Sequence, residues 1–178
     1  GDVFALIEAH RCTALSTTPA LLSTLLQLPQ KDLDIIARNV RHLQTGAMRF
    51  DPMFRERLIA ALPDTRIFLH YGLSEVMRAT FFELNAFPQK LQSEGPPSGI
   101  TEIAIFNDAG EQCATDEVGT IALRGENLCL GYLDEALWAA TLRDGWHVTA
   151  DRGALDSDGF LHFHGRRDDT ININGILV

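Results

Sequence analysis

Four residues within the stretch YGLSE, residues 71–75, have the chemistry needed to hold a magnesium nucleotide. Tyr71 can lay its ring against a purine base, and Gly72 lets the backbone approach a ligand closely. Ser74 can donate a hydrogen bond to a phosphate oxygen, and Glu75 offers the hard oxygen that Mg²⁺ prefers. A polar turn at the end of a strand uses the same residue types, so this stretch alone does not decide between the two interpretations.

A second pair of residues suited to a nucleotide lies in the last third of the chain. Asp151 is expected at the end of a strand, where its carboxylate can accept hydrogen bonds from both hydroxyls of a ribose. Arg166 follows a glycine and can donate to the same sugar or to a neighbouring phosphate. The alternatives are a turn or N-cap role for Asp151 at the bend formed by Arg152-Gly153, and a solvated surface charge for Arg166.

Residues 1–94 alternate between helix and strand patterns. DVFALIEAH is an amphipathic helix, and Thr18-Pro19 and Asp51-Pro52 are N-cap residues followed by proline, which start two more helices. Pro63 ends the second of these. Strands are predicted at TALS, RHLQT and RIFLH. This order predicts a mostly parallel sheet, whose ligands bind beyond the carboxyl ends of its strands.

The pattern changes at EGPPSG, residues 94–99, which we interpret as a linker. After it, short stretches of alternating apolar and polar residues are separated by turn residues, as in TEIAIF, GTIALRG, WHVTA and FLHFHG. We predict an antiparallel barrel or sandwich over residues 95–165, with one helix inserted at residues 134–142.

Composition excludes several classes of protein. The net charge is -9 and no run of Lys or Arg offers the basic stripe that a nucleic acid needs, although a single nucleotide can still be held locally. Cys12, Cys113 and Cys129 form no C-x-x-C pair, which predicts reduced thiols and a cytoplasmic protein. The most apolar stretch is too short and too polar to span a bilayer, so no transmembrane segment is expected.

Four stretches carry a family resemblance. VRHLQTGAM, YGLSE, GTIALRGENLCLGYLD and DGWHVTADRGALDSDGFLHFHGRRDDTININGILV resemble, in the same order and with similar gaps, successive core motifs of the AMP-forming acyl-CoA synthetase, or adenylate-forming, superfamily. The resemblance covers nearly the whole chain, and four ordered motifs are far more specific than one. It implies a partial three-layer α/β lobe at residues 1–94, a distorted antiparallel β-barrel at 95–165, and a hinge with the start of a C-terminal lid domain at 166–178.

The resemblance also implies a role for each site residue. Tyr71 would stack on the adenine, and Gly72 would belong to the same nucleotide site. Ser74 would contact the α-phosphate or the substrate carboxylate, and Glu75 would bind Mg²⁺. Asp151, helped by Arg166, would hold the ribose. The hinge residue would be Asp168, and Gly175 would lie in the lid beside the thiol tunnel.

The acyl pocket is expected at the ends of the two sheet strands. By analogy, Gly46 and Ala47 would border the adenine as well as this pocket. The full set of residues expected to line the pocket is Thr45, Gly46, Ala47, His70 and Val76. No aspartate stands among them to receive a substrate amine, so an acyl or aryl acid is preferred over an amino acid.

The implied function is a ligase that uses ATP, Mg²⁺ and a small carboxylic acid to form an acyl-adenylate. The acyl group then passes to a thiol acceptor, either coenzyme A or the pantetheine of a carrier protein. One alternative is a peptide-synthetase adenylation domain acting on an amino or aryl acid. An alternative of a different class is a non-catalytic binding or assembly module that retains the fold.

The sequence departs from the family pattern at several points. Ser74 stands where the family usually has threonine, Ala150 where it has glycine, and Asn172 where a lysine is common. No Gly/Ser/Thr-rich loop ending in lysine is present, and Lys31 and Lys90 lie in no matching context. We therefore expect a central fragment of a longer enzyme that binds ATP weakly and is inactive alone.

Overall fold

The computed structural model describes residues 3–46, 51–167, 172–173 and 176–177. The chain divides into two compact units. The first unit comprises Gly1–Leu69, Glu83–Gln92 and Asn174–Ile176, and the second comprises His70–Phe82, Ser93–Ile173 and Leu177–Val178. This division differs from the boundary at residues 94–95 inferred from the sequence, because the segment His70–Phe82, which carries YGLSE, packs with the second unit.

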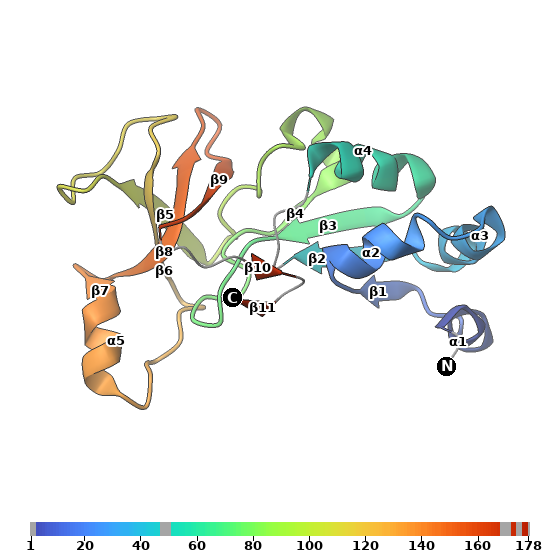
Figure 1. The fold of residues 1–178 in the computed structure, drawn as a ribbon, viewed down its shortest axis with the longest axis horizontal. Coiled ribbons are helices and arrows are strands. Elements are labelled where there is room, and N and C mark those ends of the chain that lie inside the picture. The colour runs from blue at the N-terminus through green and yellow to red at the C-terminus, as the bar shows by residue number, and fades with distance from the viewer. Residues whose placement is uncertain (1–2, 47–50, 168–171, 174–175, 178) are drawn as a thin grey trace. The chain divides into compact units, whose positions relative to one another are not determined.

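The first unit is built on a sheet whose strands lie in the order β1-β2-β3-β4 (Figure 1). β1 pairs with β2 in parallel, with Ala14 opposite His42. The strands have these bounds: β1 Ala14–Ser16, β2 His42–Gly46, β3 Arg66–His70 and β4 Phe82–Glu83. The predicted parallel α/β arrangement is therefore confirmed.

Helices pack on this sheet, and two of them start as the sequence predicts. Thr18 accepts a hydrogen bond from the backbone N–H of Leu21, and Asp51 accepts one from Met53. The helices have these bounds: α1 Val3–His10, α2 Pro19–Leu25, α3 Gln30–Asn39 and α4 Pro52–Ala61, with short 3₁₀ turns η1 Leu84–Ala86 and η2 Pro88–Lys90. Helix α3 was not predicted, because its N-cap position is Pro29, which offers no side-chain cap.

The second unit is a curled antiparallel sheet. Its strands are ordered β5-β6-β8-β7, and β9 pairs with β8. Their bounds are β5 Thr101–Phe106, β6 Gly119–Gly125, β7 Leu142–Arg143, β8 Trp146–Leu155 and β9 Leu161–Arg166. Helix α5, Glu135–Thr141, is inserted between β6 and β7 where a helix was expected, and the side chain of Asp134 caps its N-terminus. The predicted antiparallel architecture with one helix is confirmed.

One local prediction about this sheet is wrong. Asp151 was expected to end a strand, but it lies inside β8, which continues to Leu155. The Arg152-Gly153 pair makes a register shift in the β8–β9 pairing instead of a bend. Gly153 allows the strand to continue because a Cβ atom there would lie 2.6 Å from the carbonyl oxygen of His162 on β9.

In the hydrophobic core of the second unit, the antiparallel sheet packs against the segment His70–Phe82. The buried residues in this cluster are Val76, Ala79, Ile103, Ile105, Ile121, Leu123 and Leu161. Val76 and Ala79 belong to the His70–Phe82 segment, so the loop that carries YGLSE is anchored in the barrel core.

The remaining elements are β10, Asn172–Ile173, and β11, Ile176–Leu177, which form a two-stranded sheet. Asp168 and Gly175, the predicted hinge and lid residues, lie outside the described residues. Cys12, Cys113 and Cys129 are free thiols. Within the described part of the chain, no helix is long and apolar enough to cross a membrane.

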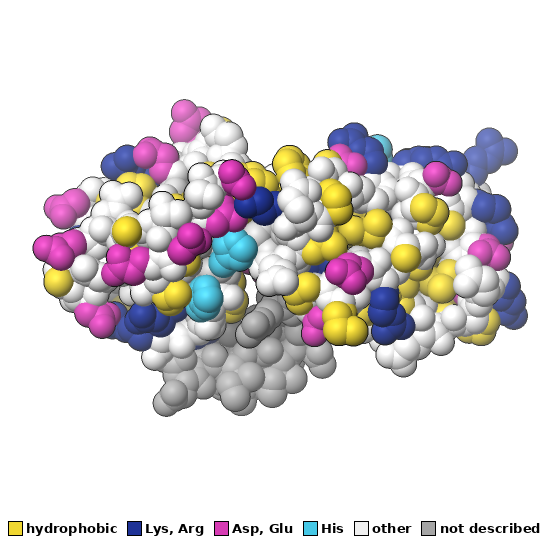
Figure 2. Space-filling view, turned by 90° about the horizontal axis from the view of Figure 1, so that it is seen from above, with side chains coloured by type: hydrophobic (Ala, Val, Ile, Leu, Met, Phe, Trp, Pro, Cys, Tyr) yellow, Lys and Arg dark blue, Asp and Glu magenta, His cyan; other side chains and the backbone are white. Residues whose placement is uncertain are grey.

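Charge is unevenly distributed between the units. Acidic side chains predominate on the second unit, and Figure 2 shows them spread over the face in view. The same face of the first unit carries Lys and Arg side chains beside apolar ones.

We expect Gly153→Ala to lower the stability of the second unit by about 1–3 kcal/mol, because the new methyl group would push β9 away from β8. Thermal unfolding followed by circular dichroism would measure this. Gly99→Ala is the matched control, since a Cβ atom at Gly99 meets nothing within 4 Å. Equal melting temperatures for the two variants would contradict the packing role of Gly153.

Candidate functional site

The loop at residues 71–80 is closed by hydrogen bonds between its own ends. The N–H of Tyr71 donates to the hydroxyl of Thr80 at 2.9 Å, and the N–H of Thr80 donates to the carbonyl of Tyr71 at 3.1 Å. Inside the loop, the N–H of Leu73 donates to the carbonyl of Val76 at 3.0 Å. These bonds fix the positions from which the YGLSE side chains project.

Gly72 is required by the tightness of this loop. A Cβ atom at this position would lie 2.6 Å from the amide nitrogen of Arg78 and 2.8 Å from the carbonyl oxygen of Val76. Both neighbours are backbone atoms that cannot turn aside as a side chain would. The glycine is explained by close packing of the loop on itself, and its predicted place in the nucleotide site stays a prediction.

Tyr71, Asp151 and Arg166 meet in the second unit. The Tyr71 hydroxyl donates to Oδ2 of Asp151 at 2.6 Å, and Nη1 of Arg166 donates to Oδ1 at 3.3 Å. Arg166 stands directly opposite Asp151 in the β8–β9 ladder. Three residues that the sequence analysis singled out thus meet in one hydrogen-bonded group, and the ligand contacts assigned to them stay predictions.

The Asp151 carboxylate is buried, with 4% of the residue exposed. Its backbone N–H donates to the hydroxyl of Thr149 at 3.0 Å. Because both carboxylate oxygens already accept hydrogen bonds, a ribose must share or replace the Tyr71 or Arg166 contact to bind here. A carboxylate has about four lone-pair sites, so it can accept additional donors.

The environment keeps the Tyr71 hydroxyl protonated. Burial raises the pKa of Tyr71 well above its ordinary value, and the negative charge of Asp151 raises it further. The ring also packs at 6.2 Å from Phe163 and contacts the core cluster. Tyr71 therefore donates its hydrogen bond to Asp151 throughout the physiological pH range.

Glu75 lies in a separate group of contacts. The hydroxyl of Tyr132 donates to Oε1 of Glu75, and the N–H of Cys129 donates to the Glu75 carbonyl at 2.7 Å. The hydrogen bond to Glu75 raises the pKa of Tyr132 to about 12, with smaller contributions from burial and from the carboxylate charge. Glu75 and Asp151 thus lie in different hydrogen-bonded groups of the same unit.

Glu75 suits a divalent cation that is shared with a ligand. Its carboxylate supplies a hard oxygen, and only Oε1 is used by Tyr132. Among the described residues, no group of three or more His, Cys, Asp or Glu side chains could hold a metal ion alone. A cation bound here would therefore take most of its ligands from phosphates and water, as Mg²⁺ commonly does.

The other predicted residues have diverse environments. Ser74 is exposed, which leaves its hydroxyl open to a ligand. Val76 is fully buried in the core cluster, so its side chain has a packing role, and its predicted place in an acyl pocket is untested. The His70 ring packs 6.5 Å from Phe81. Thr45 is buried beside Gly46 at the end of β2 in the first unit.

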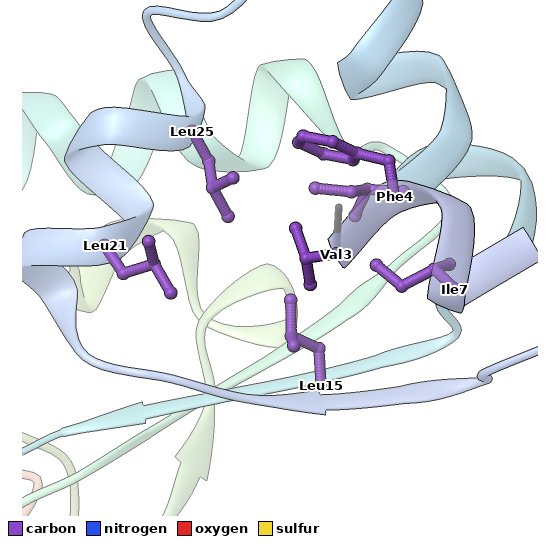
Figure 3. Close-up of a pocket in the computed structure, with 7 residues that line it drawn as sticks. Val3, Phe4, Ile7, Leu15, Leu21 and Leu25 are labelled. Atoms are coloured by element: carbon purple, nitrogen blue, oxygen red, sulfur yellow. The ribbon is translucent and has the colours of Figure 1, made fainter. Parts of the chain in front are cut away.

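Ala47 lies outside the described residues, and the acyl pocket stays a prediction. A different pocket of about 170 Å³ lies in the first unit, and Figure 3 shows its side chains converging from α1, β1 and α2. Its lining is wholly apolar: Val3, Phe4, Ile7, Leu15, Leu21, Leu25 and Ile36. None of these side chains can bind a phosphate or transfer a proton.

An aromatic group was missed by the sequence analysis. Tyr132 packs edge-on against Trp138 at 5.1 Å, and Trp138 stacks on His147 at 5.3 Å. Burial lowers the pKa of His147, while Glu75 acts in the opposite direction. Tyr132 stood within a stretch, GTIALRGENLCLGYLD, that carried the family resemblance, but no chemistry had been assigned to it.

Comparisons with known proteins identify the family of this chain. A family model described as AMP-binding enzyme matches residues 1–133. The chain is 33% identical over 178 residues to 2-succinylbenzoate–CoA ligase of Bacillus velezensis, covering 98% of this chain and 35% of the relative. It is 31% identical over 193 residues to medium/long-chain-fatty-acid–CoA ligase FadD8 of Mycobacterium tuberculosis, covering 99% and 31%.

Solved structures give the same result. O-succinylbenzoate coenzyme A synthetase of Bacillus subtilis, solved in complex with ATP and magnesium ion, matches with a TM-score of 0.80 at 28% identity. The match covers 99% of this chain and 36% of that protein. The chain thus spans about a third of the length of the relatives it matches. Since the family model covers well over half of the chain, the protein belongs to the AMP-binding enzyme family.

Proposed function

We propose that this chain is the central part of an ATP-dependent, AMP-forming ligase that joins a carboxylic acid to a thiol. The observation that carries the proposal is the meeting of Tyr71, Asp151 and Arg166 in one hydrogen-bonded group, with Ser74 and Glu75 on the loop that starts at Tyr71. The relatives named above are CoA ligases, which supports coenzyme A as the thiol over a carrier-protein pantetheine.

The first half-reaction would join the acid to AMP. An oxygen of the substrate carboxylate attacks the α-phosphorus of ATP, the bond to pyrophosphate breaks, and an acyl-adenylate forms. Asp151 and Arg166 hold the ribose, while the exposed Ser74 hydroxyl donates to the α-phosphate or to the attacking carboxylate. These residues act by positioning and by stabilising charge, which is the main contribution a protein makes to such chemistry.

In the second half-reaction, the thiol loses its proton to solvent and its sulfur attacks the acyl carbon. The bond between the acyl group and AMP breaks, so that a thioester and AMP are released. Glu75 would hold Mg²⁺ during adenylate formation, and the ion would supply positive charge beside the phosphates.

The substrate is proposed to be an acyl or aryl acid. The predicted pocket residues include no carboxylate that could pair with the amine of an amino acid. The names of the relatives, which include a succinylbenzoate ligase and a fatty-acid ligase, support this class without choosing a member of it.

The function is tested with the full-length protein in an ATP–pyrophosphate exchange assay. We expect exchange with at least one acid from a panel of fatty and aromatic acids, and thioester formation when coenzyme A is added. Absence of exchange with every acid, in a protein that binds ATP, would favour the non-catalytic assembly module.

The 178-residue chain alone is expected to release no pyrophosphate from ATP with any of these acids. The reason is that its sequence contains no lysine-ended Gly/Ser/Thr-rich loop to hold the β- and γ-phosphates. A coupled pyrophosphate assay would check this, with full-length protein as the positive control. Steady release by the isolated chain would contradict the expectation.

Asp151→Asn should weaken ATP binding by about 10–100-fold in the full-length protein. The substitution removes the negative charge that would strengthen hydrogen bonds from the ribose hydroxyls, and each such bond contributes roughly 1.5–3 kcal/mol. Titration calorimetry with ATP and with 2′,3′-dideoxy-ATP would measure this. The dideoxy nucleotide lacks both hydroxyls, so its affinity should change little.

Asp144→Asn is the matched control, because Asp144 is an exposed turn residue of the same unit and asparagine also tolerates its positive φ of 50°. Equal weakening of both nucleotides by Asp151→Asn would show that Asp151 maintains the structure and does not contact the ribose.

A further inference from the structure

The segment at residues 126–133, here called the strap, is fixed in register on the YGLSE loop. The N–H of Cys129 donates to the carbonyl of Glu75 at 2.7 Å, and Leu128 forms an antiparallel bridge with Val76. The side chain of Asn127 donates to the carbonyl of Met77 at 2.8 Å. Three successive strap residues thus contact three successive loop residues, which leaves no freedom for one segment to slide along the other.

The strap is also tied to the sheet. The Asn127 side-chain oxygen accepts a hydrogen bond from the hydroxyl of Thr101 on β5 at 3.0 Å. Gly125, where β6 ends, has a φ of 157°, and a Cβ atom there would lie 2.1 Å from the carbonyl oxygen of Ile100. The strap therefore starts from a fixed point on β6.

The Tyr132 ring is held by a stack of aromatic side chains. Trp138 on α5 meets the ring edge-on at 5.1 Å with an interplanar angle of 72°, and Trp138 lies flat on His147 at 5.3 Å. His147 is only 4% exposed and belongs to β8, and its Nδ1 lies 3.2 Å from the hydroxyl of Thr141. The position of the Tyr132 hydroxyl is therefore set by a helix and a strand and not by the strap alone.

This arrangement holds one oxygen of the Glu75 carboxylate, Oε1, in place. A glutamate side chain has several rotatable bonds, and ordering it costs conformational entropy. The Tyr132 hydroxyl donates to Oε1, which restricts the carboxylate before any ligand arrives. Within the described part of the chain no ion pair involves Glu75, so Oε2 is available to a cation.

We propose that Tyr132 is a positioning residue that orients the Glu75 carboxylate to bind the divalent cation of the nucleotide. This inference rests on the proposed function and deepens it, since it assigns to the strap a part in the metal site. Such residues, which contact a ligand of the metal and not the metal, typically change metal affinity by about 10–100-fold when they are removed.

The competing explanation is that Tyr132 only packs against Trp138. Phenylalanine would fill the same space and keep the edge-on contact, so Tyr132→Phe removes the hydroxyl and little else. The two explanations therefore give different results for this one substitution.

The experiment uses the full-length protein, with Mn²⁺ as the probe and ATP present. Water-proton relaxation reports how tightly the protein–ATP complex holds Mn²⁺, without any turnover. We expect Tyr132→Phe to weaken Mn²⁺ binding about tenfold and to leave ATP binding without metal unchanged. Cys129→Ser is the control for disturbance of the strap, because its backbone bond to Glu75 is retained; it should bind Mn²⁺ like the unmodified protein.

Glu75→Gln separates this inference from the proposed function. If Glu75→Gln weakens Mn²⁺ binding and Tyr132→Phe does not, the positioning role is overturned while the metal role of Glu75 stands. If Glu75→Gln itself has no effect, Glu75 is not a ligand, and both the metal role in the proposed function and the positioning role fall.

A second measurement needs no change at Tyr132. In unmodified protein carrying ¹³Cζ-labelled tyrosine, the Tyr132 resonance can be identified as the one that moves in the Glu75→Gln variant. We expect this resonance to shift when Mg²⁺ is added to the ATP complex, because the cation draws charge away from the hydrogen-bonded carboxylate. An unchanged resonance at saturating Mg²⁺ would overturn the proposal.

Discussion

The hydrogen bond from Tyr71 to Asp151 holds together the group of residues that is proposed to bind a nucleotide. It joins residues 80 positions apart in the chain at 2.6 Å, and its acceptor is buried. Hydrogen bonds to a charged group contribute about 1.5–3 kcal/mol, so a nucleotide that replaces this contact must return a similar amount. A ribose has two hydroxyl donors, and two new bonds can offset the one that is lost. The proposed site is therefore selective for a group that carries paired donors.

The YGLSE loop shows how packing and chemistry are combined in consecutive residues. Ser74 is exposed, Glu75 is half-buried and Val76 is fully buried in the barrel core. The burial of Val76 and its bridge to Leu128 fix the backbone, and this in turn fixes where the two polar side chains point. A polar turn without such an anchor would leave the same residue types free to move, which is why the stretch alone could not distinguish a turn from a site.

Local signals were enough to predict most elements, and contacts distant in sequence explain most of what was missed. Asp51 and Thr18 predicted where their helices start, because an N-cap hydrogen bond joins residues only two or three positions apart. Helix α3 follows Pro29 without a side-chain cap, so its start gave no such signal. Asp151 was placed at a strand end because Gly153 resembles a turn residue, whereas its role depends on the neighbouring strand. Tyr132 went unassigned because its partner, Glu75, lies 57 positions away.

The charge of the second unit limits how a nucleotide can be attracted. Acidic side chains predominate there, as the face in Figure 2 illustrates, and the whole chain carries a net charge of -9. Such a field opposes the approach of ATP, so long-range steering by this unit cannot supply the attraction. Favourable electrostatic interactions with the nucleotide must therefore be local. In the proposed site they come from Arg166 beside Asp151 and from a cation at Glu75. The charge distribution therefore supports the proposed role of a divalent cation, as does the ligand chemistry of Glu75.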